Sequence, residues 1–442
     1  RGHSLGMALP HPPSMHEVSE EQVVSVPAPD GHFTVLRAPS GEFLSARPAA
    51  EAHGQVSFFL SRWVADDALW SEEAASPSSS RFVHFSKEGR REVVLEGTAL
   101  PAQGGEGSGG ASGSAGVAGD HGRPLRLHLS SGGSPRALDE RGLPAAAGAA
   151  AVFLAQRGPA HPPSEYLDHM RKHGWVCLPA LLPPEMVGAL RHVAQQGGAE
   201  PFLESPVLAK AGLEPTVMWV LRQYLRTKSI QWGHVPNVLT AYPIGDRRYP
   251  GPQGWHSDFP YLWRAREGRI PEGEQLGDSD GLPLGVQFNT CIDAFTKDNG
   301  STRFVLGSHR RNRGPPRAWN GSPDLPGGMS TAGGGVVGRH VQPYCGAGAQ
   351  TIDCPAGSVI LYDARTWHRQ GENRTNSPRA AVPLAIVPNY VMPFFDKSRA
   401  FKRFVKSPRM DELSERERRD LRDMMLTRVG AEAVGPDREL NP

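Results

Sequence analysis

Along the first third of the chain, apolar and polar residues alternate in short runs. The segments 33–36, 81–85 and 125–129 each alternate with a period of two, and clusters of Gly, Ser and Pro separate them. Such alternation puts every second side chain on one face and predicts half-buried strands. We therefore expect residues 22–157 to form an all-β domain.

This β-rich region contains a weak repeat of about 45 residues. Phe33-Thr-Val-Leu, followed by Ser-Gly-Glu-Phe-Leu-Ser-Ala at 40–46, is echoed near Phe82 and again at 127–139. The pattern resembles the repeats of fascin-like β-trefoil domains, and a generic small β-domain is the alternative. Residues 1–21 lack periodicity and are expected to be a flexible tail, and the Gly/Ser/Ala-rich segment 102–122 to be a flexible surface loop.

The pattern changes after the proline-containing segment 158–163, which we interpret as a linker. Helical periodicity then appears before Gly174 and again after Pro183, and residues 204–227 are also predicted to be helical. From Val238 onward short apolar runs return with intervening loops, which is typical of a β-barrel or jelly-roll. We expect a second, mostly β domain with flanking helices over residues 164–430.

Overall composition narrows the class of protein. The hydrophobic content is 38% and the net charge +2, and no apolar run approaches the ~18 residues of a membrane helix. A membrane partner is therefore not expected. An arginine cluster at 310–317 leaves nucleic acid open as a partner, although solvated faces are the simpler interpretation. The cysteines, four in number, are too scattered for a disulfide framework, which favours an intracellular, reducing compartment.

Candidate chemistry is concentrated in the second domain. His256 and Asp258 form an H-x-D triplet whose alternate positions point the same way on a strand end. His368 follows another apolar run, and Arg379 lies eleven residues further on. Two imidazoles and one carboxylate on one face of an iron leave positions open for O2 and a chelating co-substrate. The planar arginine fork suits a carboxylate held by two hydrogen bonds.

These motifs occur in a familiar order. The ordered pieces are His173-Gly-Trp-Val-Cys-Leu-Pro, Trp255-His-Ser-Asp, Asp298-Asn-Gly-Ser-Thr-Arg-Phe-Val-Leu-Gly-Ser-His and Gly357-Ser-Val-Ile-Leu-Tyr-Asp-Ala-Arg-Thr-Trp-His. Together they resemble the phytanoyl-CoA dioxygenase family of Fe(II)/2-oxoglutarate oxygenases over residues 164–405. Leu306 stands where the family usually has proline. The resemblance implies a jelly-roll, or double-stranded β-helix, for the catalytic domain.

The resemblance also implies the chemistry. His256, Asp258 and His368 would be the catalytic iron ligands, and Arg379 would bind 2-oxoglutarate, with another chelating acid as the alternative co-substrate. The expected reaction uses O2, releases succinate and CO2, and hydroxylates or desaturates a small organic molecule. An oxygenase acting on a protein side chain, a glycan or a nucleic-acid base, recruited by the β-domain, is the alternative. A non-catalytic binding protein is the remote alternative.

Neighbouring residues supply further candidates. For the co-substrate we name Ser377, expected on the same strand face as Arg379, with Thr240 and Tyr242 on the strand before the iron ligands. Aromatic residues around the H-x-D triplet are candidates for binding the substrate, with core packing as the alternative: Trp255, Phe259, Tyr261 and Trp263. Two polar residues that alternate along one strand, Gln287 and Asn289, are further candidates. His309 is expected to be a turn residue. The long segment 310–350 is predicted to be a lid.

Overall fold

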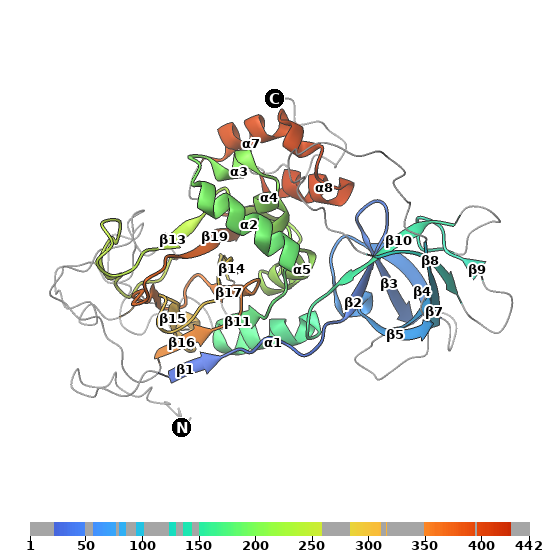
Figure 1. Cartoon of the computed structure of the whole chain (residues 1–442), viewed down its shortest axis with the longest axis horizontal. Coiled ribbons are helices and arrows are strands. Elements are labelled where there is room, and N and C mark those ends of the chain that lie inside the picture. The colour runs from blue at the N-terminus through green and yellow to red at the C-terminus, as the bar shows by residue number, and fades with distance from the viewer. Residues whose placement is uncertain are drawn as a thin grey trace, which may run out of the picture.

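The computed structural model describes residues 22–48, 56–76, 79–84, 94–100, 123–129, 136–143, 150–258, 283–310, 315, 349–393 and 396–425. The predicted tail 1–21, the predicted loop 102–122 and most of the lid segment 310–350 lie outside these residues. Two bodies lie side by side, a small β-domain and a larger domain of sheets and helices (Figure 1). Within the described ranges, every helix is too short or too polar to cross a lipid bilayer.

The small β-domain is a closed barrel. Strand β10 pairs with both β8 and β2, so the strand order β2-β5-β6-β7-β8-β10 returns to its start. The hairpin β3–β4 extends from β2 outside this ring. The trefoil resemblance stays a prediction, with which this connectivity agrees. The strands are β2 (Thr34–Arg37), β3 (Phe43–Pro48), β4 (Val56–Ser61), β5 (Trp70–Ser76), β6 (Ser79–His84), β7 (Val94–Ala99), β8 (Arg123–Leu129), β9 (Arg136–Ala137) and β10 (Val152–Arg157).

The larger domain contains two sheets, and the predicted jelly-roll is confirmed. The major sheet has the order β11-β17-β14-β19-β12, with β13 also paired to β19, and the minor sheet the order β1-β16-β15-β18. In the major sheet the strands are β11 (Trp175–Leu178), β12 (Ile230–Trp232), β13 (Leu239–Ala241), β14 (Val286–Cys291), β17 (Val359–Asp363) and β19 (Arg379–Pro388). In the minor sheet they are β1 (Gln22–Ser25), β15 (Thr302–Val305), β16 (Ala349–Asp353) and β18 (His368–Gln370).

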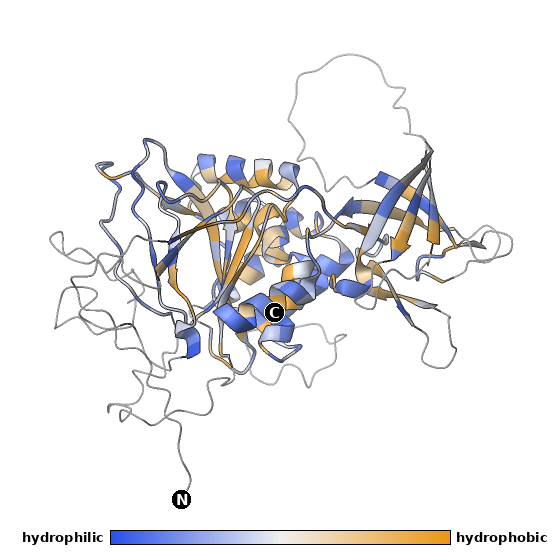
Figure 2. Ribbon diagram, turned by 90° about the horizontal axis from the view of Figure 1, so that it is seen from below, coloured by the Kyte–Doolittle hydropathy of each residue, from blue (hydrophilic) through white to orange (hydrophobic). Residues whose placement is uncertain are grey.

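Alternation along the major sheet separates two cores. Phe288, Leu361 and Leu384 face the helices, whereas Cys291, Tyr362 and Ala381 face the minor sheet. Figure 2 shows the hydrophobic strands at the centre of this domain and helices whose outer sides are hydrophilic. The helices are α1 (Pro163–His173), α2 (Pro184–Gln196), α3 (Pro201–Glu204), α4 (Val207–Gly212), α5 (Pro215–Tyr224), α7 (Ser398–Val405) and α8 (Glu415–Met424).

Two boundaries differ from the sequence prediction. Residues 22–25 do not belong to the β-domain, because β1 pairs in parallel with β16 of the minor sheet. Val24 and Val26 pack on the core between the two sheets, which explains this position. The predicted helical region 204–227 is divided into separate helices. Pro206 precedes α4 and Pro215 begins α5. Proline has no backbone N–H, so it cannot donate the hydrogen bond that would continue a helix from the preceding turn.

The C-terminal helix α8 connects the two bodies. A capping box begins this helix, with Ser414 and Glu417 each bonding the other's backbone amide. Arg62 of the β-domain donates to Asp420 at 2.5 Å and to Asp423 at 2.8 Å. Buried Arg416 donates to Asp420 from the same helix at 2.9 Å. The helix therefore lies between the domains and bonds to the β-domain.

Candidate active site

Two backbone segments meet to form the site. His256 and His368 exchange both backbone hydrogen bonds, at 3.0 and 2.9 Å, and the amide of Asp258 donates to Ala364 O at 2.9 Å. Residues that exchange both bonds in an antiparallel pair direct their side chains to the same face. The backbone pairing therefore aims both imidazoles the same way, with Asp258 beside them.

The three predicted ligands come together. Their ligand atoms all lie within 4.8 Å of one another. Asp258 Oδ1 is 3.7 Å from His256 Nε2, and Oδ2 is 3.3 Å from His368 Nε2. Both histidines are buried and Asp258 is partly so, with its side chain 19% exposed. Within the described part of the chain, no other group of three or more such residues converges in this way.

Backbone hydrogen bonds orient both imidazoles toward Asp258. His256 Nδ1 donates to Gly254 O at 2.9 Å, and His368 Nδ1 donates to Thr366 O at 2.8 Å. Each Nε2 therefore faces the Asp258 carboxylate. Burial lowers the pKa of His256 to about 4, so this ring is neutral near pH 7. Although burial opposes ionisation, the two histidines hold the pKa of Asp258 below its usual value. Two imidazoles and a carboxylate fit a divalent transition metal.

A buried ion pair supports the loop that carries His368. Arg365 donates to both carboxylate oxygens of Asp363, at 2.9 and 2.7 Å, and Tyr224 OH donates to the same carboxylate at 2.7 Å. Thr366 Oγ1 donates to Gly174 O at 3.0 Å, and Gly174 directly follows the last residue of α1. These contacts hold the turn between β17 and β18, so the position of His368 is defined by buried polar groups.

Arg379 begins β19 and is almost fully buried. Its guanidinium lies over the ring of Phe295 at 3.9 Å, Nη2 donates to Gly300 O at 2.7 Å and Nε to Asn299 O at 3.5 Å. Among the described residues no carboxylate forms an ion pair with it. Burial lowers the pKa of Arg379 to about 10, which still leaves it charged at neutral pH. A buried cation that makes no ion pair with any described carboxylate is suited to bind an anion.

Gln287 and Asn289 alternate on β14 and face the space between the sheets, as their spacing predicted. Gln287 hydrogen-bonds the carboxylate of Asp258, and Asn289 hydrogen-bonds Tyr362. The Tyr362 ring lies 4.7 Å from the ring of His368. Both polar residues thus contact the surroundings of the triad, Gln287 by orienting a ligand directly.

The structure does not support the predicted environment of three co-substrate candidates. Ser377 is exposed in the turn before β19, because the strand begins only at Arg379. Thr240 is the strand partner of Ala380, which packs toward the helices, so it faces away from Arg379. Tyr242 lies just beyond β13, where Arg248 stacks over its ring at 4.1 Å. The residue opposite Arg379 is Ala241.

The aromatic candidates divide into two groups. Trp255 is buried with Trp367, Val305 and Ala349 in a small apolar cluster, which favours the core alternative. Phe259, Tyr261 and Trp263 lie outside the described residues. His309 is buried against Gly174, whose added Cβ would lie 2.4 Å from His309 Nδ1, and it is not part of the triad.

Sequence reasoning assigned no role to the turn that holds Arg379. Gly300 adopts φ +85°, and a Cβ there would lie 3.0 Å from Gly371 O. Asn299 stabilises the turn by accepting from Thr296 N at 2.8 Å and donating to Ala294 O at 2.8 Å. The Asn299-Gly300 dipeptide indicates a turn. The contact with Arg379 is made by the backbone carbonyls of this turn, which a pattern of side chains does not reveal.

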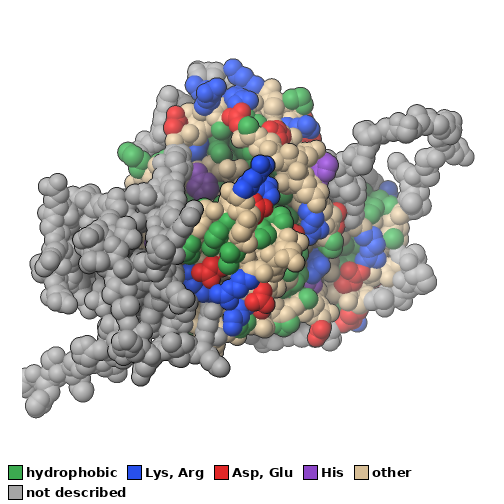
Figure 3. All heavy atoms as spheres, turned by 60° about the vertical axis from the view of Figure 1, so that its left-hand side comes forward, with side chains coloured by type: hydrophobic (Ala, Val, Ile, Leu, Met, Phe, Trp, Pro, Cys, Tyr) green, Lys and Arg blue, Asp and Glu red, His purple; other side chains and the backbone are tan. Residues whose placement is uncertain are grey.

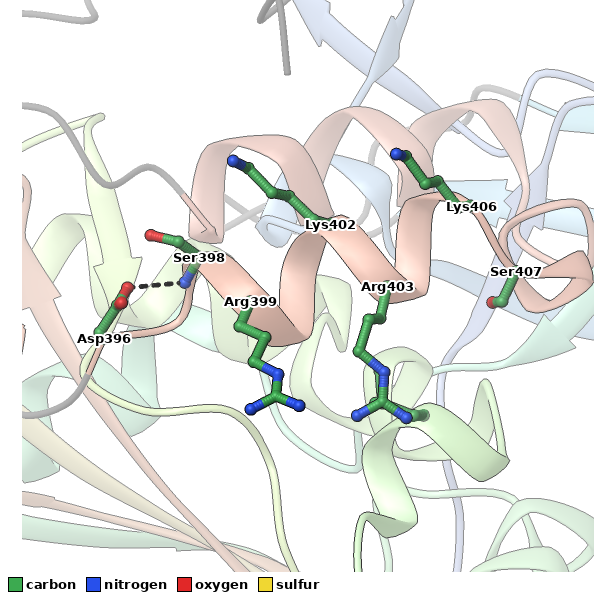
Figure 4. A pocket seen from close by; sticks show the side chains of 8 residues that line it. Asp396, Ser398, Arg399, Lys402, Arg403, Lys406 and Ser407 are labelled. Carbon is green, nitrogen blue, oxygen red and sulfur yellow. Dashed lines mark hydrogen bonds between the residues drawn. The ribbon is translucent and has the colours of Figure 1, made fainter.

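An open pocket of about 730 Å³ lies elsewhere, along α7. Arg399, Lys402, Arg403 and Lys406 line it (Figure 4), and lysine and arginine side chains also gather over α7 at the top of the face in Figure 3. None of the triad residues lines this pocket. We therefore place the candidate chemistry at the triad and not at this pocket.

The fold and the triad define a jelly-roll domain with a non-haem metal site. Residues 162–381 match the phytanoyl-CoA dioxygenase (PhyH) family, and this part of the chain belongs to it. The domain is therefore of the Fe(II)/2-oxoglutarate-dependent dioxygenase type.

Similarity to curated proteins is partial. The chain is 25% identical over 170 residues to the uncharacterized protein Rv1501 of Mycobacterium tuberculosis, which covers 38% of this chain and 46% of that protein. It is 28% identical over 144 residues to the dioxygenase olcK of Penicillium canescens, covering 32% of this chain and 35% of olcK. The chain thus spans about half or less of the length of these relatives.

Solved structures with similar chains were also found. The epimerase SnoN, in complex with Fe3+, alpha-ketoglutarate and nogalamycin RO, is 16% identical with a TM-score of 0.36, covering 51% of this chain and 84% of SnoN. EvdO2 from Micromonospora carbonacea var. aurantiaca, complexed with 2-oxoglutarate, is 18% identical with a TM-score of 0.35, covering 51% of this chain and 90% of EvdO2.

Proposed function

We propose that this chain is an Fe(II)- and 2-oxoglutarate-dependent dioxygenase that oxidises a small organic substrate, with hydroxylation as the default reaction. The observation that carries the proposal is the convergence of His256, Asp258 and His368 within 4.8 Å in a domain of this family. Arg379, a buried cation without a carboxylate partner among the described residues, supports an acidic co-substrate.

The protein's part in this reaction is to hold and orient. His256, Asp258 and His368 would bind iron on one face, and the bound iron supplies the activation of O2 that no side chain can perform. Gly254 and Thr366 accept the Nδ1 protons and so keep each Nε2 available as a ligand. These contacts fix the orientation of both rings, so the protein itself positions the ligand atoms.

Arg379 would bind the distal carboxylate of 2-oxoglutarate. The carbonyls of Asn299 and Gly300 and the ring of Phe295 hold the guanidinium in one orientation. Arginine's planar fork can then make two parallel hydrogen bonds to a carboxylate. Ser377 and Thr240 are not part of this proposal, since neither faces the guanidinium.

Aromatic rings line part of the interior side of the site, beside the polar Gln287 and Asn289. Phe304 pairs with His368 across the minor sheet, and the rings of Phe304 and Tyr362 stack edge to face at a centroid distance of 4.8 Å. These rings exclude water from the inner side of the triad, which strengthens the electrostatic interactions of the ligands. Substrate would then approach from the opposite side.

The alternative is an oxygenase that acts on a macromolecule recruited by the β-domain. The observation that favours it is the firm attachment of the β-domain to α8 through Arg62, Asp420 and Asp423. A domain attached in this way would hold a large partner at a defined distance from the triad. The intact triad and Arg379 count against a purely non-catalytic binding protein.

The first experiment is an anaerobic titration of the Fe(II)-loaded full chain with 2-oxoglutarate, following the visible metal-to-ligand charge-transfer band. We expect the band to appear and to saturate. An iron-loaded protein that never develops the band would contradict 2-oxoglutarate as co-substrate and favour another chelating acid.

A second experiment separates small from large substrates. The holoprotein is incubated with 2-oxoglutarate, O2 and a cell extract divided by molecular mass, and succinate formation is measured above the substrate-free rate. Stimulation by the low-mass fraction supports the proposal. Stimulation by the high-mass fraction alone, lost after protease, nuclease or glycosidase treatment, favours the alternative.

A further inference from the structure

Three buried cysteines gather between the two sheets, on the side of Arg379. Cys177 lies on β11, Cys291 on β14, and Cys354 directly after β16. All three belong to the apolar core that joins the sheets, together with Ala381, two residues beyond Arg379 on β19. Three thiols in one core are more than packing requires, and none has a part in the proposed reaction.

Cys291 and Cys354 are in direct contact, with their Sγ atoms 3.8 Å apart. Their backbones are held by short hydrogen bonds. Cys354 exchanges both bonds with Phe295, each at 2.9 Å, and Cys291 bonds Ser358 O and Gly357 N at 2.9 and 2.8 Å. A disulfide has an S–S length of about 2.05 Å, so the two sulfurs must approach by only about 1.7 Å.

From this contact we propose that Cys291 and Cys354 form a reversible disulfide that links the major and minor sheets when the protein meets a peroxide. The two sulfurs come from different sheets, and 63 positions separate them in sequence. The cross-link would therefore add a covalent connection between two sheets that the backbone alone otherwise joins.

The surroundings of Cys354 favour it as the attacking sulfur. Hydrogen bonds from the Cys177 and Cys291 thiols hold the pKa of Cys354 well below its usual value. Burial and the neighbouring sulfur raise the pKa of Cys291. The nearby cation Arg379 also favours negative charge on this side of the core. These opposite directions favour Cys354 over Cys291 as the sulfur that ionises first.

The chemistry balances with hydrogen peroxide as oxidant. The Cys354 thiolate attacks one peroxide oxygen, the O–O bond breaks, and the departing hydroxide takes a proton to leave as water. The resulting sulfenic acid is attacked by the sulfur of Cys291, whose proton leaves with the hydroxyl as a second water. Two thiols lose two electrons, and one peroxide is reduced to two waters.

The cross-link lies next to the proposed co-substrate anchor. Phe295 pairs with Cys354 through its backbone and supports the Arg379 guanidinium with its ring. A movement of Cys354 toward Cys291 would therefore shift Phe295 and the guanidinium it carries. Displacement by about 1 Å can weaken a positioned interaction strongly, and we expect 2-oxoglutarate affinity to fall on the order of tenfold. Only this consequence rests on the proposed function.

The test begins with the reduced full chain, treated with hydrogen peroxide and then alkylated. Peptide mapping should show a Cys291–Cys354 disulfide that dithiothreitol reverses, with Cys177 and Cys345 still alkylated. The variant Cys291→Ala should abolish it and leave Cys354 as sulfenic acid. Cys345→Ser, which changes the one cysteine outside the described residues, should leave it unchanged.

Several results would overturn the proposal. These are a disulfide between Cys177 and Cys354, a cross-link between two chains, oxidation of Cys354 only to sulfinic acid, or thiols that stay unreacted while added glutathione is oxidised. The wild-type mapping needs no variant, so a misfolded Cys291→Ala does not weaken it.

The effect on 2-oxoglutarate is measured separately, by the charge-transfer titration of reduced and oxidised protein. Unchanged affinity in fully cross-linked protein would overturn the link to Arg379. If the reduced protein shows no 2-oxoglutarate band at all, the proposed function fails and the disulfide mapping still stands or falls by itself.

Discussion

His256 and His368 lie opposite each other and exchange both backbone hydrogen bonds, at 3.0 and 2.9 Å. Their rings are 4.3 Å apart between centroids. This backbone pairing thus fixes the separation of two candidate metal ligands. Metal geometry in this protein depends on backbone register more than on side-chain flexibility.

Replacing the carboxylate of this face should remove the metal. We expect Asp258→Ala to lower iron affinity by more than the roughly 10- to 100-fold loss typical of residues that only support ligands. Iron content after dialysis against Fe(II), measured by elemental analysis, checks this. His192→Gln, an exposed histidine on α2, is the matched control and should bind iron normally. Normal iron retention in Asp258→Ala would place the metal site elsewhere.

Removing the buried guanidinium should separate co-substrate binding from metal binding. Arg379→Ala is expected to weaken 2-oxoglutarate binding by about 100-fold, since a hydrogen-bonded charge pair contributes about 2–3 kcal/mol. Iron affinity should stay within a few-fold of wild type. The charge-transfer titration measures both quantities. Arg374→Ala is the control, because that exposed arginine pairs only with Glu372 among the described residues. Equal affinities in the two variants would rule out Arg379 as the anchor.

Gln287 offers a test of ligand positioning. Its hydrogen bond to Asp258 orients the carboxylate, so Gln287→Leu should reduce iron affinity roughly 10-fold without removing a ligand. We also expect an altered d–d spectrum of the Co(II)-substituted protein, which a purely structural role would leave unchanged. Gln195→Leu on the exposed face of α2 serves as control. Recovery of both signals in Gln287→Asn would support the hydrogen-bonding role.

The iron ligands could be predicted from sequence because each depends on a local feature. His256 and Asp258 are two positions apart, and His368 directly follows the apolar strand β17 and its turn. Gln287 and Asn289 could be read for the same reason, since β14 is long enough for its alternation to be unambiguous. Period-two patterns place side chains well when the strand is identified.

The errors came from register and from strand ends. Thr240 is expected near the co-substrate from the strand before the iron ligands, but β13 is only three residues long and its pairing puts Ala241, not Thr240, opposite Arg379. A shift by one residue exchanges the two faces of a strand. Ser377 was placed on a strand that the turn at Asn373 delays, because Asn373 donates to both Ala241 O and Ser377 O at 2.8 Å. Such long-range bonds leave no local pattern.

The contact between the domains gives a prediction on stability. Asp420 is fully buried and accepts from Arg62 and Arg416, so Asp420→Ala leaves two arginines without their shared partner. We expect a loss of about 3 kcal/mol in the free energy of unfolding. Asp423→Ala removes a half-exposed partner of the same Arg62 and should cost below about 1 kcal/mol. Urea denaturation measures both, and equal effects would contradict a buried network at α8.

The last prediction concerns pH. Burial raises the pKa of Glu214, which caps α5 by accepting from Val217 N at 2.7 Å, to about 7. Between the ordinary value of 4.5 and about 7, the folded state therefore holds a proton that the unfolded state has released. Stability from this residue should accordingly fall as pH rises through that window, by at most about 3 kcal/mol.

Glu214→Gln isolates this contribution, because glutamine keeps an acceptor for Val217 N and does not titrate. We expect the unfolding free energy of Glu214→Gln, relative to wild type, to increase steadily from pH 5 to pH 7.5. Glu200→Gln is the control, since Glu200 is exposed and pairs with Arg403 at the surface. Urea denaturation at several pH values provides the measurement. If the difference in unfolding free energy between Glu214→Gln and wild type stays constant over this range, Glu214 is ionised throughout. Burial would then not raise its pKa into this window.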